Sequence, residues 1–388
     1  MAAARRLRLM LIGFLVAIAT VFAFNYLVNP WGAWRFHLVS ARYRRVTNRD
    51  ERTVTPYLLH TSSPETLLLG SSRVVYGMKI EQGVKDGFQN AALSGSRMPE
   101  IAKEVDLALR NPHLKRVIWG VEFYTFDAYA DSCAPDTCAR LDGDLRLELT
   151  DNLLSSDTFV ASYRMVLRAL MGKISRAATM PIPWPGPFIC GMFAHPEPPT
   201  LAGMDAARRF REVGNLPEYR RFDYSARMRQ SFVDILGRLR GAHVEVIAFV
   251  PPVTQFELEM IRQTGRWPDF QAWKGFVAQH IPYTDFSGYN GIARSDRMFI
   301  DAWHMEPAVG ATIMRQLLDD APPDCPDAAI VANSALKVTA QDAGQMQALQ
   351  ERRMEEATAT PNVYSTTVAA AIVKRYGHIA LPDLSARK

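Results

Sequence analysis

The sequence predicts an α/β protein in which a three-layer parallel sheet follows one N-terminal transmembrane helix. An uncharged apolar run, Leu9–Val28, lies close to the start of the chain. Through the middle of the chain, short and almost continuously apolar segments alternate with segments of helical periodicity. That alternation is typical of buried parallel strands covered by helices on both faces. Hydrophobic residues make up 48% and charged residues 22% of the chain, which excludes wholesale disorder.

Residues 1–28 are expected to form a membrane anchor. A helix of about 20 uncharged residues spans about 30 Å, the thickness of the hydrocarbon core of a bilayer. The alternative is a cleaved signal peptide, whose apolar region would be shorter and would be followed by a small-x-small site. The only Ala-x-Ala, Ala17–Ala19, lies inside the run, whereas Tyr26 and Trp31 fit an aromatic border at the membrane surface.

Charge and cysteine content indicate where the rest of the chain lies. Arg5, Arg6 and Arg8 precede the apolar run, which favours a single-pass protein of the cytoplasmic membrane with its N-terminus inside and its main domain in the periplasm. Cys133 and Cys138 are close enough in sequence to close a small ring, which suits an oxidising compartment. Four unrelated buried thiols are the alternative. The net charge of +5 is mild and scattered, so nucleic acid is not an expected partner.

The remaining chain is expected to contain a stalk over 29–65, an α/β domain over 66–320 and a partly helical tail over 321–388. A proline-rich inserted loop is expected over 173–200, and one helix over 326–357. Five short apolar segments are the expected strands of the domain: 66–69, 88–93, 116–123, 243–250 and 282–286. Five segments with helical spacing are its expected helices: 99–110, 150–172, 224–241, 267–280 and 307–318.

Two serine- and glycine-containing motifs follow expected strands, at the sheet edge where parallel α/β sheets bind their ligands. The first is Gly70-Ser71-Ser72-Arg73. A serine in this place is presented at the edge, and the amides of a following helix can stabilise an oxyanion there. The alternative is a serine that only caps a helix. The second motif, Asn90–Arg97, can offer the amide of Gly95 to the same pocket, or it is only a turn.

A third motif, Asp301-Ala302-Trp303-His304, precedes the last expected helix of the domain. An aspartate three residues before a histidine can reach its Nδ1 and fix its tautomer. The other ring nitrogen, Nε2, is then able to take the proton of a serine. Of the eight histidines, only His304 has an aspartate at this spacing.

Together the three motifs resemble the sequence blocks of the SGNH (GDSL-like) hydrolase superfamily of serine esterases and acyltransferases, over roughly residues 64–320. The resemblance implies a flavodoxin-like sheet. It makes Ser72 the nucleophile, because Gly70-Ser71-Ser72 matches the Gly-Asp-Ser block with serine in the place of aspartate. It also implies that the amides of Ser72 and Gly95 form the oxyanion hole, and that Asp301 and His304 complete a Ser-His-Asp triad.

The third block of that superfamily is not present. It is normally Gly-x-Asn-Asp, and its asparagine completes the oxyanion hole, whereas the corresponding strand here ends Gly120-Val121-Glu122-Phe123. An ionised glutamate cannot donate a hydrogen bond, and its charge would oppose a developing oxyanion. Glu122 is therefore protonated, points elsewhere, or is replaced by another donor. A Gly-Ser-Ser opening without the third block also occurs in a membrane-anchored branch that is similar to the DltD-like and alginate-acetylation proteins.

The resemblance to that branch implies a serine esterase or O-acyltransferase acting on an acyl group of a cell-envelope polysaccharide or glycan. It also implies a membrane-bound acyltransferase as a partner. Arg73, Arg97 and Asn90 are candidates for substrate binding, the two arginines because a guanidinium can hold an anionic group. No cofactor is expected, and no C-x-x-C or His-rich spacing suggests a metal. The alternative is a non-catalytic scaffold or binding module of an envelope-polymer assembly complex, for which Glu122 is the argument.

Overall fold

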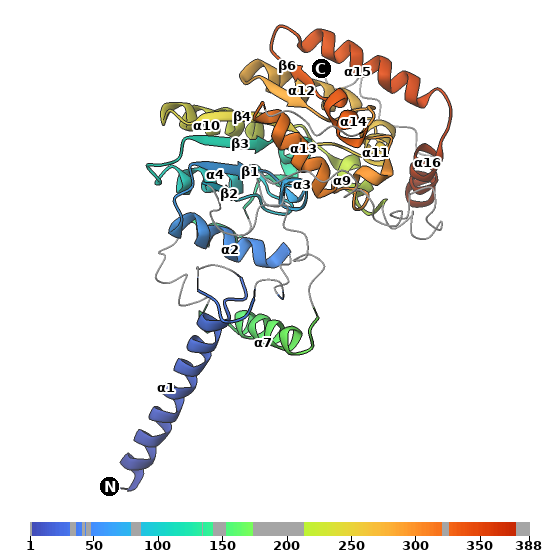
Figure 1. The fold of residues 1–388 in the computed structure, drawn as a ribbon. Helices are drawn as coiled ribbons and strands as arrows, with labels where there is room; N and C mark the ends of the chain where they lie inside the picture. Colours follow the sequence, from blue (N-terminus) through green and yellow to red (C-terminus); the bar gives the residue numbers. More distant parts are fainter. Residues whose placement is uncertain are drawn as a thin grey trace.

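A six-stranded sheet forms the centre of the protein in the computed structural model (Figure 1). The order of the strands is β2-β1-β3-β4-β5-β6; the first five are parallel, and β6 is antiparallel to β5. The prediction of an α/β fold on a parallel sheet is confirmed, with one antiparallel edge strand added. The strands are β1 (Thr66–Leu69), β2 (Phe88–Asn90), β3 (Arg116–Gly120), β4 (Glu245–Val250), β5 (Tyr283–Asp285) and β6 (Leu336–Val338).

The structure describes most of the chain outside one long segment. The expected inserted loop, 173–200, lies outside the described residues except for its first position. The described residues are 2–31, 36–40, 43, 48–78, 87–133, 135–142, 153–173, 213–319 and 326–377.

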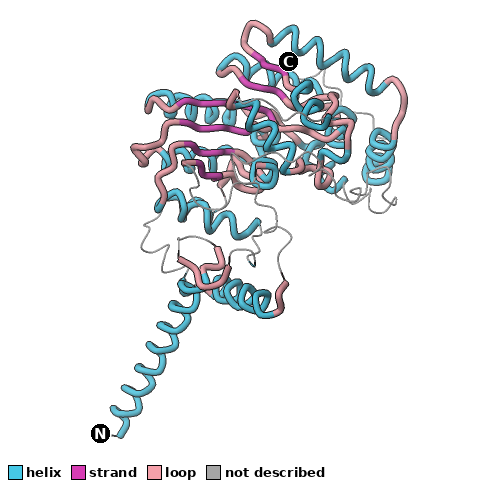
Figure 2. The backbone as a smooth tube through the Cα atoms, in the orientation of Figure 1, coloured by secondary structure: helices cyan, strands magenta, loops and turns pink. Residues whose placement is uncertain are grey.

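Helices cover both faces of the sheet, so that it is the middle of three layers (Figure 2). Successive side chains of a strand point to opposite faces, and in β1 Leu67 and Leu69 join one buried apolar cluster while Leu68 joins the other. The cluster of Leu67 includes residues of α4 (Met98–Ala108), α10 (Ala226–Gly241) and α12 (Trp267–His280). The cluster of Leu68 includes residues of α3 (Ser72–Gly77), α13 (Pro307–Leu317) and α14 (Pro326–Ser334).

Two glycines permit the close packing of the segments that follow β1. Gly70 has a φ of +150°, and a Cβ there would lie 2.5 Å from Val74 Cγ2, so both backbone and space favour glycine. A Cβ on Gly310 would lie 2.2 Å from the carbonyl oxygen of Gly77, so glycine lets α13 approach α3 closely. This contact places the residues before α13 beside the start of α3.

The expected stalk, 29–65, is corrected for its second half, because residues 48–61 form helix α2 (Asn48–Thr61). Helix α2 packs against α4 and α5 (Pro135–Asp142), and its Val54, Leu58 and Leu59 are buried. The helix was not predicted because the segment begins with polar residues and contains Pro56, which is unusual inside a helix. Residues 48–61 therefore belong to the domain.

The expected tail, 321–388, is also corrected, because its described part is built into the domain. It provides α14, β6, α15 (Ala343–Thr358) and α16 (Val363–Tyr376), where one helix over 326–357 was expected. β6 covers the edge of β5, which would otherwise present unpaired backbone groups to solvent. α16 packs against α11 (Gln255–Gln263), a helix buried on all sides and not expected from the sequence.

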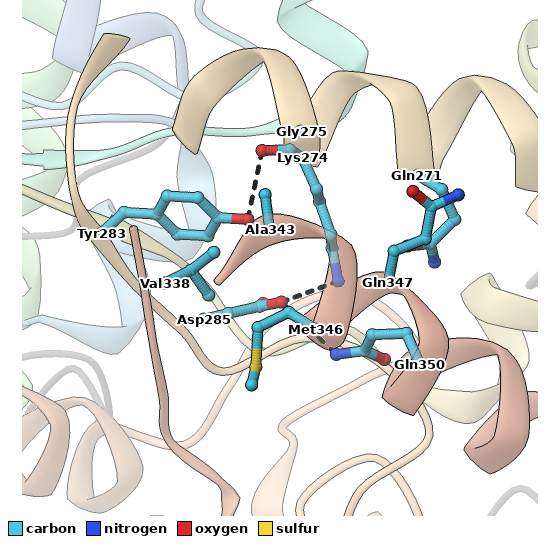
Figure 3. A pocket seen from close by; sticks show the side chains of 10 residues that line it. All are labelled: Gln271, Lys274, Gly275, Tyr283, Asp285, Val338, Ala343, Met346, Gln347 and Gln350. Atoms are coloured by element: carbon cyan, nitrogen blue, oxygen red, sulfur yellow. Dashed lines mark hydrogen bonds and ion pairs between the residues drawn. The ribbon is translucent and has the colours of Figure 1, made fainter. Parts of the chain in front are cut away.

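A small polar pocket joins α15 to the sheet (Figure 3). Lys274 Nζ lies 2.8 Å from Asp285 Oδ2, and both side chains are buried. From α15, Gln350 Nε2 donates to the carbonyl oxygen of Ser287 at 3.3 Å. Burial lowers the pKa of Lys274, although the charge of Asp285 acts in the opposite direction. These groups bond to one another, so we assign the pocket to the attachment of the C-terminal helices.

Helix α1 (Ala2–Val28) extends away from the domain with its N-terminus at the far end (Figure 1). It is long and apolar enough to cross a membrane, and its most apolar window buries no residue against the rest of the protein. Its C-terminal end contacts α7 (Ser156–Leu170), which lies in the segment 150–172 that was expected to be helical.

Candidate active site

Ser72, His304 and Asp301 form one continuous chain of hydrogen-bonding groups. Ser72 Oγ lies 2.9 Å from His304 Nε2. On the other side of the ring, His304 Nδ1 lies 2.8 Å from Asp301 Oδ2 and 3.0 Å from Oδ1. The serine and the histidine are 232 positions apart in sequence, so the fold alone brings them together. In this geometry the aspartate holds the proton on Nδ1 and leaves Nε2 able to accept the serine proton.

The Asp-x-x-His segment is held in a short hairpin. Phe299 and Met305 form an isolated antiparallel bridge, and the amide of Ile300 donates to the carbonyl oxygen of His304 at 2.8 Å. Asp301 Oδ1 accepts the amide of His304 at 2.8 Å in addition to its contact with the ring. The aspartate therefore closes its own turn and orients the histidine at the same time.

The carboxylate of Asp301 is stabilised in its ionised form. Partial burial raises its pKa, but the hydrogen bond and charge of His304 and the amides of Trp303 and His304 outweigh burial. The pKa of Asp301 therefore lies below its ordinary value. An ionised aspartate is what a protonated His304 needs as its partner during proton transfer.

The two serines after β1 have separate roles. Ser71 is the N-cap of α3, and its Oγ accepts the amide of Arg73 at 3.1 Å. Ser72 is the first residue of the helix, is half-buried, and turns its hydroxyl to His304. Helix capping, the alternative function for a serine here, thus falls to Ser71, while the hydroxyl of Ser72 faces His304.

The second motif lies directly beside the first. The carbonyl oxygen of Gly70 accepts the amide of Leu93 and the hydroxyl of Ser96, each at 3.1 Å. Gly95 between them has a φ of +61°, in the left-handed region that favours glycine. Within the described part of the chain, the amides of Gly95 and Ser72 have no hydrogen-bond partner, so both are available as donors.

Helix α2 fastens the loop that carries Gly95, a role that the sequence did not suggest. Glu51 accepts the amide of Ser94 at 2.8 Å and the hydroxyl of Tyr76 at 3.3 Å. Arg52 donates to the carbonyl oxygens of Ser94 and Gly95, at 2.7 and 3.4 Å. Burial raises the pKa of Glu51, and the bonds from Ser94 and Tyr76 oppose that rise. Two adjacent residues of α2 therefore hold the backbone of both Ser94 and Gly95.

Tyr76 also contacts His304. Its ring meets that of His304 edge to face, with centroids 5.0 Å apart. Burial, followed by the nearby charge of Glu51, raises the pKa of Tyr76, so its hydroxyl stays neutral. The histidine is thus restrained by Asp301 at one edge and by an aromatic ring against its side.

Arg73 is corrected as a candidate for substrate binding, because its side chain is buried beneath the triad. It forms ion pairs with Glu122, at 2.5 Å, and with Glu257 of α11. Its Nε donates to the carbonyl oxygen of Trp303 at 3.1 Å, in the hairpin that carries His304. Burial lowers the pKa of Arg73, but the charges of Glu257 and then Glu122 raise it above its ordinary value. Arg73 therefore joins the segment after β3, helix α11 and the hairpin of His304 to α3.

The same contacts explain the glutamate that replaces the expected asparagine. Glu122 is buried, its Oε2 is paired with Arg73, and its Oε1 accepts the amide of Ser71 at 3.2 Å. Its charge is balanced by the arginine, and both carboxylate oxygens are occupied. Of the three expectations for Glu122, the structure agrees with the second, since the side chain points elsewhere, to Arg73 and the amide of Ser71.

The other two candidates for substrate binding have structural contacts as well. Asn90 donates to the carbonyl oxygens of Val74 and Met78 at 3.2 and 2.9 Å, which ties α3 to the end of β2. Asn90 is therefore corrected to a residue that supports α3. Arg97 precedes α4 and donates to Ser132 at 3.0 Å near the surface. Arg97 remains a candidate for substrate binding only as a side chain at the edge of the site.

The site lies at the point of the sheet where the connections between strands change direction. β1 is flanked by β2 on one side and β3 on the other, and the chain crosses over in opposite senses to reach them. Connections that diverge from such a point leave a crevice at the carboxyl ends of the strands.

In the described residues, no group of three or more His, Cys, Asp or Glu side chains is placed to hold a metal ion. No family of known proteins and no curated protein matches this chain.

Proposed function

We propose that this chain is a serine esterase or O-acyltransferase that uses Ser72, His304 and Asp301. The observation that carries the proposal is the unbroken chain of hydrogen bonds from Ser72 Oγ through His304 to Asp301. The start of α3 supplies Ser72, and a hairpin far away in sequence supplies Asp301 and His304. A chance contact would have to satisfy both bonds together. A helix-capping serine would not need the histidine, and here Ser71 already caps the helix.

The reaction follows the usual steps of acyl transfer through a serine. Ser72 Oγ attacks the carbonyl carbon of an ester while its proton moves to His304 Nε2, and Asp301 stabilises the resulting imidazolium. The carbonyl oxygen becomes an oxyanion, for which the amides of Ser72 and Gly95 are the donors. Collapse breaks the ester bond, and Nε2 returns the proton to the leaving alcohol. Water or a sugar hydroxyl then attacks the acyl-serine by the same steps in reverse.

The SGNH (GDSL-like) superfamily accounts for this arrangement best. The order β2-β1-β3-β4-β5 is that of flavodoxin-like sheets, whose ligands bind at the β1–β3 switch point. Ser72, Gly95 and His304 come from the segments that the sequence blocks of the superfamily would supply. The membrane-anchored branch is favoured because Glu122 stands in place of the third block and is paired with Arg73.

The proposed substrate is an acyl ester on a cell-envelope polysaccharide or glycan, with a membrane-bound acyltransferase as partner. Helix α1 would anchor the chain in the cytoplasmic membrane with its N-terminus inside and the domain in the periplasm. The disulfide between Cys133 and Cys138 supports an oxidising compartment. The non-catalytic scaffold is the weaker candidate, because the charge of Glu122 that motivated it is balanced by Arg73.

A serine-directed fluorophosphonate probe tests the proposed nucleophile. The probe should label the wild-type protein on Ser72, because His304 can take the proton of its hydroxyl, and Ser72→Ala should abolish labelling. The matched control is Ser71→Ala, which removes the neighbouring hydroxyl and a helix cap worth about 1 kcal/mol but leaves the contact with His304. It should still be labelled. Labelling of a folded Ser72→Ala protein at the wild-type rate would refute the proposal.

A second prediction concerns the fastening of the oxyanion loop. Arg52→Met removes the hydrogen bonds to the carbonyl oxygens of Ser94 and Gly95, together with the ion pair to the buried Glu100 at 3.1 Å, so the amide of Gly95 loses its fixed direction. We expect kcat for p-nitrophenyl acetate to fall about 10- to 100-fold with little change in KM, since the loss affects the oxyanion more than the bound ester. Arg97→Met removes another arginine of the same loop, whose side chain bonds to Ser132 within the described residues. Because p-nitrophenyl acetate has no anionic group for an arginine to hold, this variant should stay close to wild type. Equal kcat values for Arg52→Met and Arg97→Met would contradict the role of Arg52 in holding the loop that carries Gly95.

A further inference from the structure

Helix α7 presents an apolar face to the outside of the protein. Phe159, Tyr163 and Leu170 are 41%, 53% and 79% exposed. At 3.6 residues per turn these positions fall on one side of the helix, and the exposed Val160 flanks them. In a soluble domain the most apolar face of a helix packs on the core, and here it faces outward.

The buried face of the same helix is largely polar. Thr158 Oγ1 accepts the indole N–H of Trp31 at 3.0 Å, and Ser162 Oγ donates to Asn25 Oδ1 at 2.8 Å. Asn25 also donates to the carbonyl oxygen of Leu153, just before the helix, at 2.8 Å. Specific hydrogen bonds thus hold the polar face on the end of α1. Among the described residues, the ring of Phe159 contacts Phe24 at one end of the apolar face, and the rest of that face points outward.

These contacts fix the height of α7 relative to the proposed membrane span. They involve residues 24–31, where the apolar run of α1 ends, and the rings of Phe24 and Phe159 lie 5.5 Å apart. Figure 1 shows α7 beside the domain end of α1 and running across its direction. A helix in this place lies where hydrocarbon gives way to lipid headgroups.

The charges around the exposed face complement a lipid surface. Arg164 and Lys173 are exposed beside it, and Asp157 is the one acidic residue between 153 and 173. Cationic side chains at the edge of an apolar helix face are typical of helices that lie in the interface of membranes with anionic lipids.

From these observations we propose that α7 is an interfacial helix, with its apolar face inserted at the surface of the bilayer that α1 spans. The proposal rests on the proposed anchoring by α1 and adds a second attachment to it. A single helix leaves a domain free to rotate about its axis, whereas α1 and α7 together hold one side of the domain against the membrane. The active-site hairpin then keeps a constant direction relative to the lipid surface.

Spin labels on the full-length chain in vesicles of phosphatidylethanolamine and phosphatidylglycerol test this proposal. Labels are placed by Tyr163→Cys and Leu170→Cys, with Val16→Cys on α1 and Val373→Cys on α16 as references for lipid and water. Cys190 and Cys325 are replaced by serine in all four proteins. For each label we measure the rate of collision with oxygen divided by the rate of collision with a water-soluble nickel chelate. This ratio should be at least about threefold higher at positions 163 and 170 than at position 373, as expected for a helix inserted in the interface.

The outcomes separate the anchor from the interfacial helix. If the label at position 16 reports lipid while those at 163 and 170 match position 373, the anchor stands and the proposal for α7 is overturned. If position 16 also reports water, both are overturned. Labels at 163 and 170 that are immobile and shielded from both quenchers would indicate a protein partner, which equally contradicts insertion into lipid.

Discussion

Replacing Asp301 by asparagine is expected to lower kcat for ester hydrolysis about 10⁴-fold while the protein stays folded. In the wild type, the carboxylate accepts the N–H of His304 Nδ1, which leaves Nε2 unprotonated toward Ser72. An amide NH₂ in that place donates instead, so it favours the tautomer with its proton on Nε2. That tautomer cannot accept the proton of the serine. Steady-state hydrolysis of p-nitrophenyl acetate measures the loss.

The control for this variant is Asp131→Asn, which neutralises an exposed aspartate whose ion-pair partner within the described residues is Arg227, at 3.5 Å. An exposed ion pair of this kind contributes little, so kcat should stay within about twofold of wild type. Loss of activity in both variants, or in neither, would contradict the role of Asp301.

Unfolding as a function of pH gives a second measurement on the same variant. The pKa of Asp301 is lower in the folded protein than its ordinary value of 3.8, because the contacts with His304, Trp303 and the hairpin amides outweigh burial. A lowered pKa stabilises the folded state above the ordinary pKa, and that contribution is lost as the pH falls through the folded value. The difference in unfolding free energy between wild type and Asp301→Asn should therefore be present at neutral pH and shrink below pH 3.8.

The parts of the fold with a local pattern could be predicted from the sequence. The strand 66–69 and the helix 267–280 have the bounds expected from apolar runs and from helical spacing. The grouping of Ser72, His304 and Asp301 could be anticipated because each motif follows a strand or precedes a helix, and parallel strands bring their carboxyl ends to one edge. The direction in which each side chain points at that edge could not be predicted, because it depends on contacts between segments that are far apart in sequence.

The support of the site shows where local patterns fail. Glu51 and Arg52 lie in a polar stretch that looked like a stalk, and only the packing of α2 on α4 brings them to the loop that carries Gly95. Glu257 lies on a helix that is buried all around, because α16 covers its outer side. Such a helix has no exposed polar face to mark it. An arginine after a serine, such as Arg73, is most simply expected to face solvent.

The largest effect on stability is expected from Arg73→Met. Methionine fills a similar volume but leaves the carboxylates of Glu122 and Glu257 buried without a cation, with only 2% and 4% of their side chains exposed. Removing one partner from a buried ionic cluster costs about 3–5 kcal/mol, because the remaining charges lose their compensation. Urea unfolding of Arg73→Met should show a loss of this size, whereas Arg97→Met, at the surface, should change the free energy of unfolding by less than about 0.5 kcal/mol.

A triple variant separates lost charge balance from lost packing. Adding Glu122→Gln and Glu257→Gln to Arg73→Met removes the uncompensated charges and should recover most of the lost stability, because neutral replacements of a buried ionic cluster are often tolerated. Activity should not recover with it, since Arg73 also donates to the carbonyl oxygen of Trp303 and so fixes the hairpin of His304. A triple variant that regains both stability and full kcat would show that Arg73 only balances charge. One that regains stability alone would show that the ionic cluster under the nucleophile also positions the base.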